Sequence, residues 1–156
     1  MNLSRRRAIK TGAGTGIMAM LFAAGVLRPG EVLAQDGGDA AFSKKTLADA
    51  LSAVGAQSPA NSDAIVIKAP AIAENGAVVP IAVESKLPGT QSIALLVEKN
   101  PTPLVANFTI PPDTESSIAT RVKMGQTSDV MVLVKADGKF YVARQEIKIT
   151  LGGCGG

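Results

Sequence analysis

Four glycines surround a single cysteine in the segment Gly152, Gly153, Cys154, Gly155 and Gly156, and the chain of 156 residues contains no other cysteine. A deprotonated thiol is a nucleophile and a point of covalent attachment. Glycine carries no side chain and adopts both signs of φ, so we expect residues 152–156 to form a flexible arm. Five extended residues reach at most roughly 17 Å. This pattern indicates a thiol that is carried into the cleft of another protein.

No basic residue lies next to Cys154, so we expect the protein that the thiol visits to activate it. The chain has no histidine, which excludes the commonest general base and any Ser-His or Cys-His pair. One cysteine excludes a C-x-x-C pair and an internal disulfide. No dinucleotide-binding or P-loop motif occurs. The sequence therefore predicts a protein that is not an autonomous enzyme, with no catalytic residue, cofactor or metal site of its own.

Residues 1–34 have the three parts of an export signal. Ser4 is followed by Arg5, Arg6 and Arg7, then comes the apolar stretch 16–27, and Val32-Leu33-Ala34 provides small residues for cleavage. The apolar stretch is 12 residues long, whereas a membrane span needs about 20. The paired arginines resemble a twin-arginine signal, from which Ala8 departs. We expect export of the folded protein to the periplasm, together with a partner.

The positive charge of the whole chain belongs to this signal. The net charge is +3, and residues 1–34 hold five of the 16 basic residues but one of the 13 acidic residues. Without them the net charge becomes −1. Aromatic residues make up 3% of the chain, so few side chains could stack on bases. Nucleic-acid binding is therefore not supported.

The segment from Ser43 to Gly55 has the pattern of a short helix. Leu47, Leu51 and Val54 recur at helical spacing, Ser43 is the expected N-cap and Gly55 the expected stop. A loop follows at 56–62. Beyond it the apolar residues recur with a period of two, which is typical of strands with one buried face.

Seven such strands are expected, with Pro88-Gly89 and Asp137-Gly138 as turns between them. In the last strand the apolar residues change parity near Arg144, which predicts a bulge or a change of pairing partner. The apolar positions are Ile65, Ile67 and Ala69; Val79, Ile81 and Val83; Ile93, Leu95 and Val97; Leu104, Ala106, Phe108 and Ile110; Ile118, Thr120, Val122 and Met124; Val130, Val132 and Val134; and Phe140, Val142, Ile147, Ile149 and Leu151.

The predicted fold class is mostly β, an antiparallel immunoglobulin-like β-sandwich of about seven strands with a short N-terminal helix. The antibody type is excluded because tryptophan and a cysteine pair are missing. The expected domains are the signal 1–34, one sandwich domain at 35–151 and the arm at 152–156.

Three other functions are open to a chain of this kind. One is an immunoglobulin-like structural or adhesion module whose thiol only links chains through intermolecular disulfides. A second is a ubiquitin-like sulfur carrier activated at a terminal Gly-Gly, but that chemistry is cytoplasmic and this chain carries an export signal. A third, a thiol oxidoreductase, lacks a second cysteine.

Several segments resemble the SoxY family, the sulfur-carrier subunits of the thiosulfate-oxidising Sox system. The terminal Gly-Gly-Cys-Gly-Gly follows a strand that reads IKITL at 147–151. Four longer segments agree as well, namely residues 69–83, 87–108, 119–130 and 136–156. The resemblance covers nearly all of the chain beyond the signal, and the terminal pentapeptide is its most specific part.

The resemblance implies an immunoglobulin-like sandwich that forms a heterodimer with SoxZ, a small sandwich subunit without its own signal. It implies that Cys154 is the covalent attachment site for sulfur intermediates. The implied enzyme partners are a c-type haem protein that joins thiosulfate to the thiol, a dimanganese hydrolase that releases sulfate and, where present, a sulfane dehydrogenase. The carrier itself is then non-catalytic and has no membrane anchor.

Overall fold

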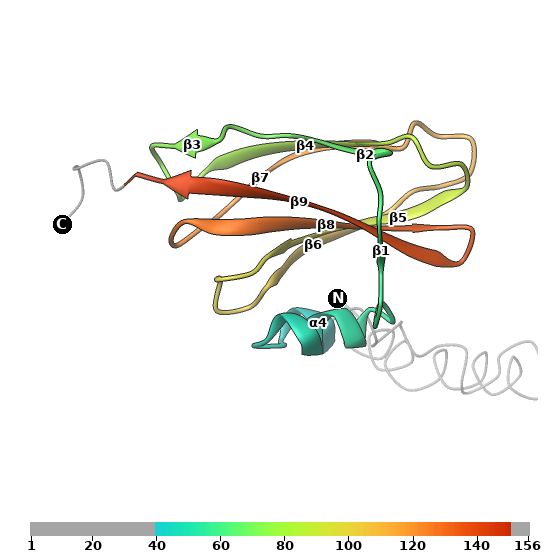
Figure 1. Ribbon diagram of the computed structural model, residues 1–156, viewed down its shortest axis with the longest axis horizontal. Coiled ribbons are helices and arrows are strands. Elements are labelled where there is room, and N and C mark those ends of the chain that lie inside the picture. Colours follow the sequence, from blue (N-terminus) through green and yellow to red (C-terminus); the bar gives the residue numbers. More distant parts are fainter. Residues whose placement is uncertain (1–39, 151–156) are drawn as a thin grey trace, which may run out of the picture. The chain divides into compact units, whose positions relative to one another are not determined.

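The computed structural model describes residues 40–150, which form two β-sheets packed against each other (Figure 1). The larger sheet has the strand order β1-β9-β8-β5-β6, and β3 pairs with another part of β9. The smaller sheet has the order β2-β4-β7. The strands are β1 (Ala60–Asn61), β2 (Ile65–Lys68), β3 (Ile72–Ala73), β4 (Val79–Ser85), β5 (Thr90–Val97), β6 (Leu104–Thr109), β7 (Ser117–Val122), β8 (Ser128–Ala136) and β9 (Lys139–Ile149).

The predicted β-sandwich is confirmed, and the seven predicted strands are β2 and β4 to β9. Pairing among them is antiparallel throughout. The two further strands, β1 and β3, are two residues long and both pair in parallel with β9. Runs of two residues are too short to show a period in the sequence, so they were not predicted.

The main core lies between the two sheets. Alternate residues of β4, β5 and β8 point into it, as the period of two requires. Truncating one such large side chain to alanine typically costs about 2–5 kcal/mol. The fully buried members are Val79, Ile81, Val83, Ile93, Leu95, Val97, Val130, Val132, Val134 and Ile147.

A second core lies on the opposite face of the larger sheet, where helix α4 (Leu47–Ala53) covers it (Figure 1). Ala50 of the helix is fully buried there against the sheet. The strands β5 and β8 are consequently buried on both faces, and they supply Ala94, Leu96, Met131 and Leu133 to this second core. The sequence expectation assigned only one buried face to each of these two strands.

The helix begins later than the sequence predicts. Thr46, not Ser43, is the N-cap, and its hydroxyl oxygen accepts a hydrogen bond from the Asp49 N–H at 3.1 Å. The Ser43 hydroxyl instead donates to the Ala40 carbonyl at 2.8 Å. Both residue types cap helices, and Thr46 is preferred because Leu47 already faces the second core. Gly55, with φ of 81°, follows the helix as expected.

Strand β9 contains no bulge at Arg144. Its register with β8 is continuous from Lys139 to Ile147. The parity of its apolar residues changes because Phe140 and Val142 face the second core, whereas Ile147 and Ile149 face the main core. The alternative prediction, a change of pairing partner, is confirmed on the other edge of β9. There β1 pairs at one end and β3 at the other.

The two predicted turns are present. Asp137 and Gly138 both have positive φ, 47° and 73°, and join β8 to β9 as a two-residue hairpin. Gly89 has φ of 63°, and a Cβ atom there would collide with the carboxylate of Asp137. Glycine is therefore favoured at Gly89 by its backbone conformation, and any other residue would also have to displace the Asp137 side chain.

The position of the cap gives a stability prediction. Thr46→Ala should lower the free energy of unfolding by about 1 kcal/mol, because the Asp49 N–H loses its partner at the helix start. Ser43→Ala is the matched control and should cost less. Urea unfolding of residues 35–156, followed by circular dichroism, measures both. A larger loss for Ser43→Ala than for Thr46→Ala would contradict the assigned cap.

Candidate functional site

The predicted attachment site lies beyond the part of the chain that the structure describes. Cys154 and the glycines Gly152, Gly153, Gly155 and Gly156 all fall within 151–156, outside the described residues, as does the predicted signal 1–34. Thr150 is the last described residue. The structure therefore shows the segment that precedes the predicted arm, which we call the arm root and define as Ile147–Thr150 with the residues that bind them.

Hydrogen bonds hold the arm root on two sides. On one side β3 pairs with β9, and the Lys148 N–H donates to the Ala71 carbonyl at 2.9 Å. The Thr150 N–H donates to the Ala73 carbonyl at 3.1 Å. On the other side the Thr127 hydroxyl oxygen accepts from the Ile149 N–H at 3.0 Å. Each backbone N–H so bound fixes the direction of the chain, so the body of the protein determines the position of the chain at Thr150.

Packing below the root depends on Gly76. Its carbonyl accepts a hydrogen bond from the Met124 N–H at 2.7 Å. A Cβ atom on Gly76 would collide with the Met124 carbonyl oxygen and would lie 3.1 Å from Cγ2 of Ile149. Asn75 holds this turn, because its side-chain oxygen accepts from the Ala77 N–H at 2.9 Å. Because residue 76 is glycine, the Asn75-Gly76 turn can lie close to both the Met124 backbone and the Ile149 side chain of the root.

Two apolar side chains beside the root are exposed. Ile72 in β3 is 58% exposed and Val78, which precedes β4, is 48% exposed. With Phe42, which lies near the helix, they are the large apolar side chains most exposed among residues 40–150. The surface next to the arm root is therefore partly apolar, which is typical of contact surfaces.

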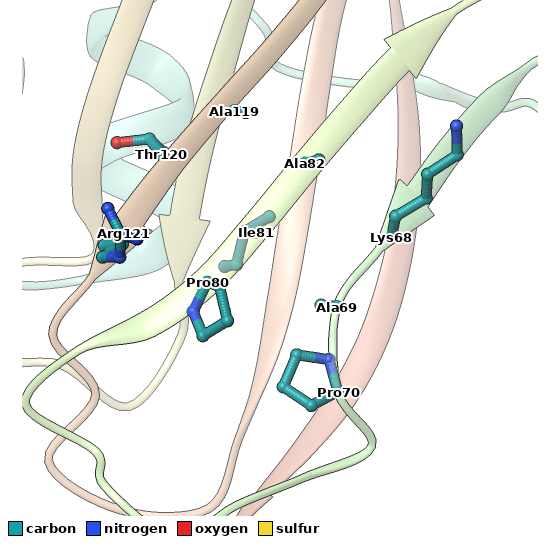
Figure 2. Close-up of a pocket in the computed structure, with 9 residues that line it drawn as sticks. All are labelled: Lys68, Ala69, Pro70, Pro80, Ile81, Ala82, Ala119, Thr120 and Arg121. Atoms are coloured by element: carbon teal, nitrogen blue, oxygen red, sulfur yellow. The ribbon is translucent and has the colours of Figure 1, made fainter.

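A shallow hollow of about 370 Å³ lies on the outer face of the smaller sheet, and Figure 2 shows the residues that line it. It exists because the pairing of β2 with β4 stops at Lys68 and Ala82. After Pro70 the chain leaves to pair with β9. Pro80 of β4 therefore has no paired residue in β2, although it pairs with Arg121 of β7. Because proline has no N–H, the missing strand leaves no backbone donor of Pro80 without a partner. Sequence reasoning missed this hollow, although Pro70 and Pro80 were visible signals.

Lys68 and Arg121 lie on opposite sides of this hollow (Figure 2). Lys68 Nζ is 3.0 Å from Glu84 Oε2, and both side chains are largely exposed. This hydrogen bond, together with the positive charge of Lys68, lowers the pKa of Glu84. An exposed pair of this kind contributes little to stability because water screens it. Lys68 is therefore already engaged by a carboxylate.

A second and larger hollow, of about 660 Å³, lies between β6 and β7. These two strands are the outer strands of the two sheets on the same side of the sandwich. We call this hollow the side groove. It is lined by Phe42, Asn100, Pro101, Thr102, Leu104, Val105, Ala106, Thr120, Arg121, Val122, Lys123 and Gly125.

Residues 40–150 contain no group of three or more histidine, cysteine or carboxylate residues placed to hold a metal ion. In the same range no helix is long and apolar enough to cross a membrane. Every fully buried side-chain nitrogen or oxygen atom there has a hydrogen-bond partner. The described body thus offers a positioning framework with surface hollows.

A comparison with protein-family models matches residues 51–154 to the family described as sulfur oxidation protein SoxY. The matched range covers most of the chain and includes Cys154. The chain belongs to the SoxY family. The resemblance seen in the terminal pentapeptide and in the strand segments is thereby confirmed at the level of the family.

Solved structures agree with this assignment. The sulfur carrier protein SoxY from Chlorobium limicola f thiosulfatophilum is 40% identical to this SoxY-family chain, with a TM-score of 0.62. The match covers 72% of this chain and 98% of that one. A variant of superoxide reductase (neelaredoxin) from Ignicoccus hospitalis matches at 16% identity and a TM-score of 0.50, covering 64% of this chain and 87% of that one, which is a likeness of fold alone. A comparison with curated proteins gave no match.

The contact at Gly76 gives a second prediction. Gly76→Ala should lower the free energy of unfolding by about 1–3 kcal/mol, because the new methyl group forces apart Met124 and Ile149. Gly125→Ala is the matched control, since nothing lies within 4 Å of a Cβ atom there. Both substitutions lower the conformational entropy of the unfolded chain by the same amount, so this effect cancels when the two variants are compared. Equal urea midpoints for the two variants would disprove the close approach at the root.

Proposed function

We propose that this chain is a periplasmic, non-catalytic carrier of thiosulfate-derived sulfur intermediates, which are bound covalently to Cys154. The observation that carries the proposal is the match to the SoxY family, which extends to Cys154 itself. The 40% identity to a sulfur carrier protein, over 98% of that protein's chain, supports the same role. The lack of histidine supports a role in which other proteins supply acid–base chemistry.

The chemistry of attachment is an oxidation. The thiol of Cys154 and thiosulfate join through a new sulfur–sulfur bond, one proton leaves, and two electrons pass to an acceptor. We assign that acceptor to a c-type haem enzyme. The product is a thiosulfonate, in which the outermost sulfur carries three oxygens and a negative charge.

The release of sulfate is a hydrolysis. Water attacks the sulfonate sulfur, the sulfur–sulfur bond next to it breaks, and sulfate and two protons leave. The carrier keeps the second sulfur as a persulfide anion. We assign this step to a dimanganese hydrolase and the removal of the remaining sulfur to a sulfane dehydrogenase where one is present. Covalent attachment prevents loss of the reactive intermediates between these enzymes.

The arm root supports this use of Cys154. Ile149 and Thr150 are hydrogen-bonded to Thr127 and Ala73, so the arm starts from a fixed point on the body. Cys154 lies four residues beyond Thr150, which corresponds to a reach of roughly 13–14 Å in extended chain. A fixed base and a short reach place the sulfur adduct in an enzyme cleft while the body stays outside.

The remaining assignments belong to the same proposal. We propose that SoxZ, a second small sandwich subunit without a signal, forms a heterodimer with this chain. Export in the folded state through the twin-arginine signal at 1–34 would then carry both subunits to the periplasm.

The attachment is tested by the mass of the mature protein taken from cells that are oxidising thiosulfate, before and after reduction. A reducible adduct on the peptide that contains Cys154 is expected. Cys154→Ser should abolish thiosulfate oxidation and leave the urea midpoint unchanged, because residue 154 follows β9, the last strand of the described residues, and the predicted arm adds nothing to either core. An unmodified thiol, or only a disulfide dimer, during active oxidation would instead favour a structural module that cross-links chains.

The glycines of the arm give a further prediction. Replacing Gly152 and Gly153 by valine should reduce turnover with at least one enzyme partner, because β-branched side chains stiffen the arm and widen it at a cleft entrance. The attachment of thiosulfate and the release of sulfate are measured separately with purified partners. Wild-type rates in both steps would show that these two glycines are not needed.

A further inference from the structure

Asn75 and Gly76 form the single asparagine-glycine pair of the chain, and the Asn75 side chain is exposed. Asparagine is a thermolabile residue, because its side-chain amide loses ammonia when the backbone nitrogen of the next residue attacks its Cγ atom. Glycine in that next position favours the attack, since it has no side chain to block the approach and restricts the backbone least. Whether the pair reacts in the folded protein depends on the hydrogen bonds of the turn that contains it.

Two backbone N–H groups of this turn donate to the two carbonyl groups of Asn75. The Ala77 N–H donates to the side-chain oxygen at 2.9 Å, and the Val78 N–H donates to the backbone oxygen at 3.3 Å. The first bond places the side chain across the Gly76 peptide group, as in an Asx turn, and so brings Cγ towards the Gly76 nitrogen. The same N–H points at the oxygen that becomes negative during the attack, which is the arrangement of an oxyanion hole.

The Gly76 nitrogen is available as the nucleophile. Within residues 40–150 its N–H donates to no oxygen atom, although the Gly76 carbonyl accepts from the Met124 N–H at 2.7 Å. A peptide nitrogen attacks only after it has lost its proton. The hydrogen bond from Val78 withdraws electron density from the Asn75-Gly76 peptide group and makes its N–H more acidic. The turn therefore promotes both the formation of the nucleophile and its attack.

The other asparagines of the described residues lack this arrangement. Asn100 precedes a proline, whose nitrogen carries no hydrogen. The residue after Asn61 donates its N–H to the Val142 carbonyl at 3.0 Å, and Asn107 lies in the paired strand β6 before a phenylalanine. The Asp137-Gly138 turn also contains a glycine, but an ionised carboxylate is a poorer target for a nitrogen nucleophile than an amide. Asn75 is therefore the residue at which the reaction is expected.

We propose that Asn75 is a site of spontaneous deamidation, promoted by the N–H groups of its own turn. The Gly76 nitrogen loses its proton and bonds to Cγ, the side-chain NH2 group leaves as ammonia with that proton, and a cyclic imide results. Water then opens the imide at either carbonyl. Opening at Cγ gives aspartate, and opening at the backbone carbon gives isoaspartate, in which the main chain runs through the side chain of residue 75. The inference does not depend on the proposed function.

The two products affect the structure differently. Aspartate keeps the backbone unchanged and keeps a side-chain oxygen that accepts from the Ala77 N–H. Isoaspartate adds one methylene group to the main chain next to Gly76, and there the Met124 carbonyl oxygen and the Ile149 side chain leave no space for an added carbon atom. The turn must move, and the hydrogen bond from Met124 to Gly76 is lost.

This movement loosens the arm root. Ala73, two residues before Asn75, accepts the Thr150 N–H at 3.1 Å. It belongs to β3, which is only two residues long and has little else to hold it in register when the following turn is displaced. The amide hydrogens of Met124 and Thr150 should therefore exchange with solvent faster in the isoaspartate form.

The first experiment compares the folded mature protein, residues 35–156, with a synthetic peptide of residues 70–80 that has the same local sequence. Both are kept in mildly alkaline buffer, with a reductant to prevent disulfide dimers, and mass spectrometry follows the gain of one mass unit at each asparagine. Asn75 should convert before Asn61 and Asn107, and at least as fast in the protein as in the peptide. Clearly slower conversion in the folded protein would overturn the proposal, because the turn would then protect Asn75.

Two variants separate the reaction from its consequence. Asn75→Gln moves the amide one carbon further from the Gly76 nitrogen and should suppress the gain of mass at this position. Asn75→Asp carries the same charge as isoaspartate on an unchanged backbone. The isoaspartate form, isolated by chromatography, should have a lower urea midpoint than both the wild type and Asn75→Asp, and faster exchange at Met124 and Thr150. Equal midpoints and equal exchange for this form and Asn75→Asp would disprove the coupling to the arm root.

Discussion

The continuous pairing of β9 with β8 is the interaction on which the other features depend. It runs from the Asp137-Gly138 turn to Ile147 without a register shift. Because β8 lies in the middle of the larger sheet and is buried on both faces, β9 cannot slide without exposing apolar side chains from one core or the other. The other edge of β9 pairs first with β1 and then with β3. The arm root is therefore held at a position set by the centre of the fold.

Both surface hollows form where a strand of one sheet has no neighbouring strand beside it. One forms where β2 leaves β4 so that β3 can pair with β9, and the other forms where β6 and β7 remain outer strands. Closing either side with another strand would remove a hollow and would also change the surroundings of the arm root. A carrier needs a stable body and an accessible thiol, and the sandwich combines a doubly covered central sheet with two uncovered sides.

Much of the fold was predictable because it depends on local patterns. The seven longer strands follow from alternating apolar residues, and the Asp137-Gly138 hairpin follows from residues that accept positive φ. The wrong predictions concern residues near the second core, where helix α4 packs on the larger sheet. The helix cap moved from Ser43 to Thr46 because the helix packs on the sheet. Of the two alternatives predicted for β9, the bulge was wrong and the change of pairing partner was confirmed, and the parity change itself reflects the two cores. The unbroken apolar runs 93–97 and 130–134 were the available sign of that second core.

The sequence by itself determined which residue is the candidate for chemistry, because Cys154 is the single thiol in a chain without histidine, and the glycines on both sides of it predict an arm. Only the tertiary structure decided what surrounds the start of that arm. The contacts of Ile149 with Thr127 and of Gly76 with Met124 join residues far apart in the chain. Such pairs leave no local period, since they are selected by how two sheets and a helix bury their apolar faces together.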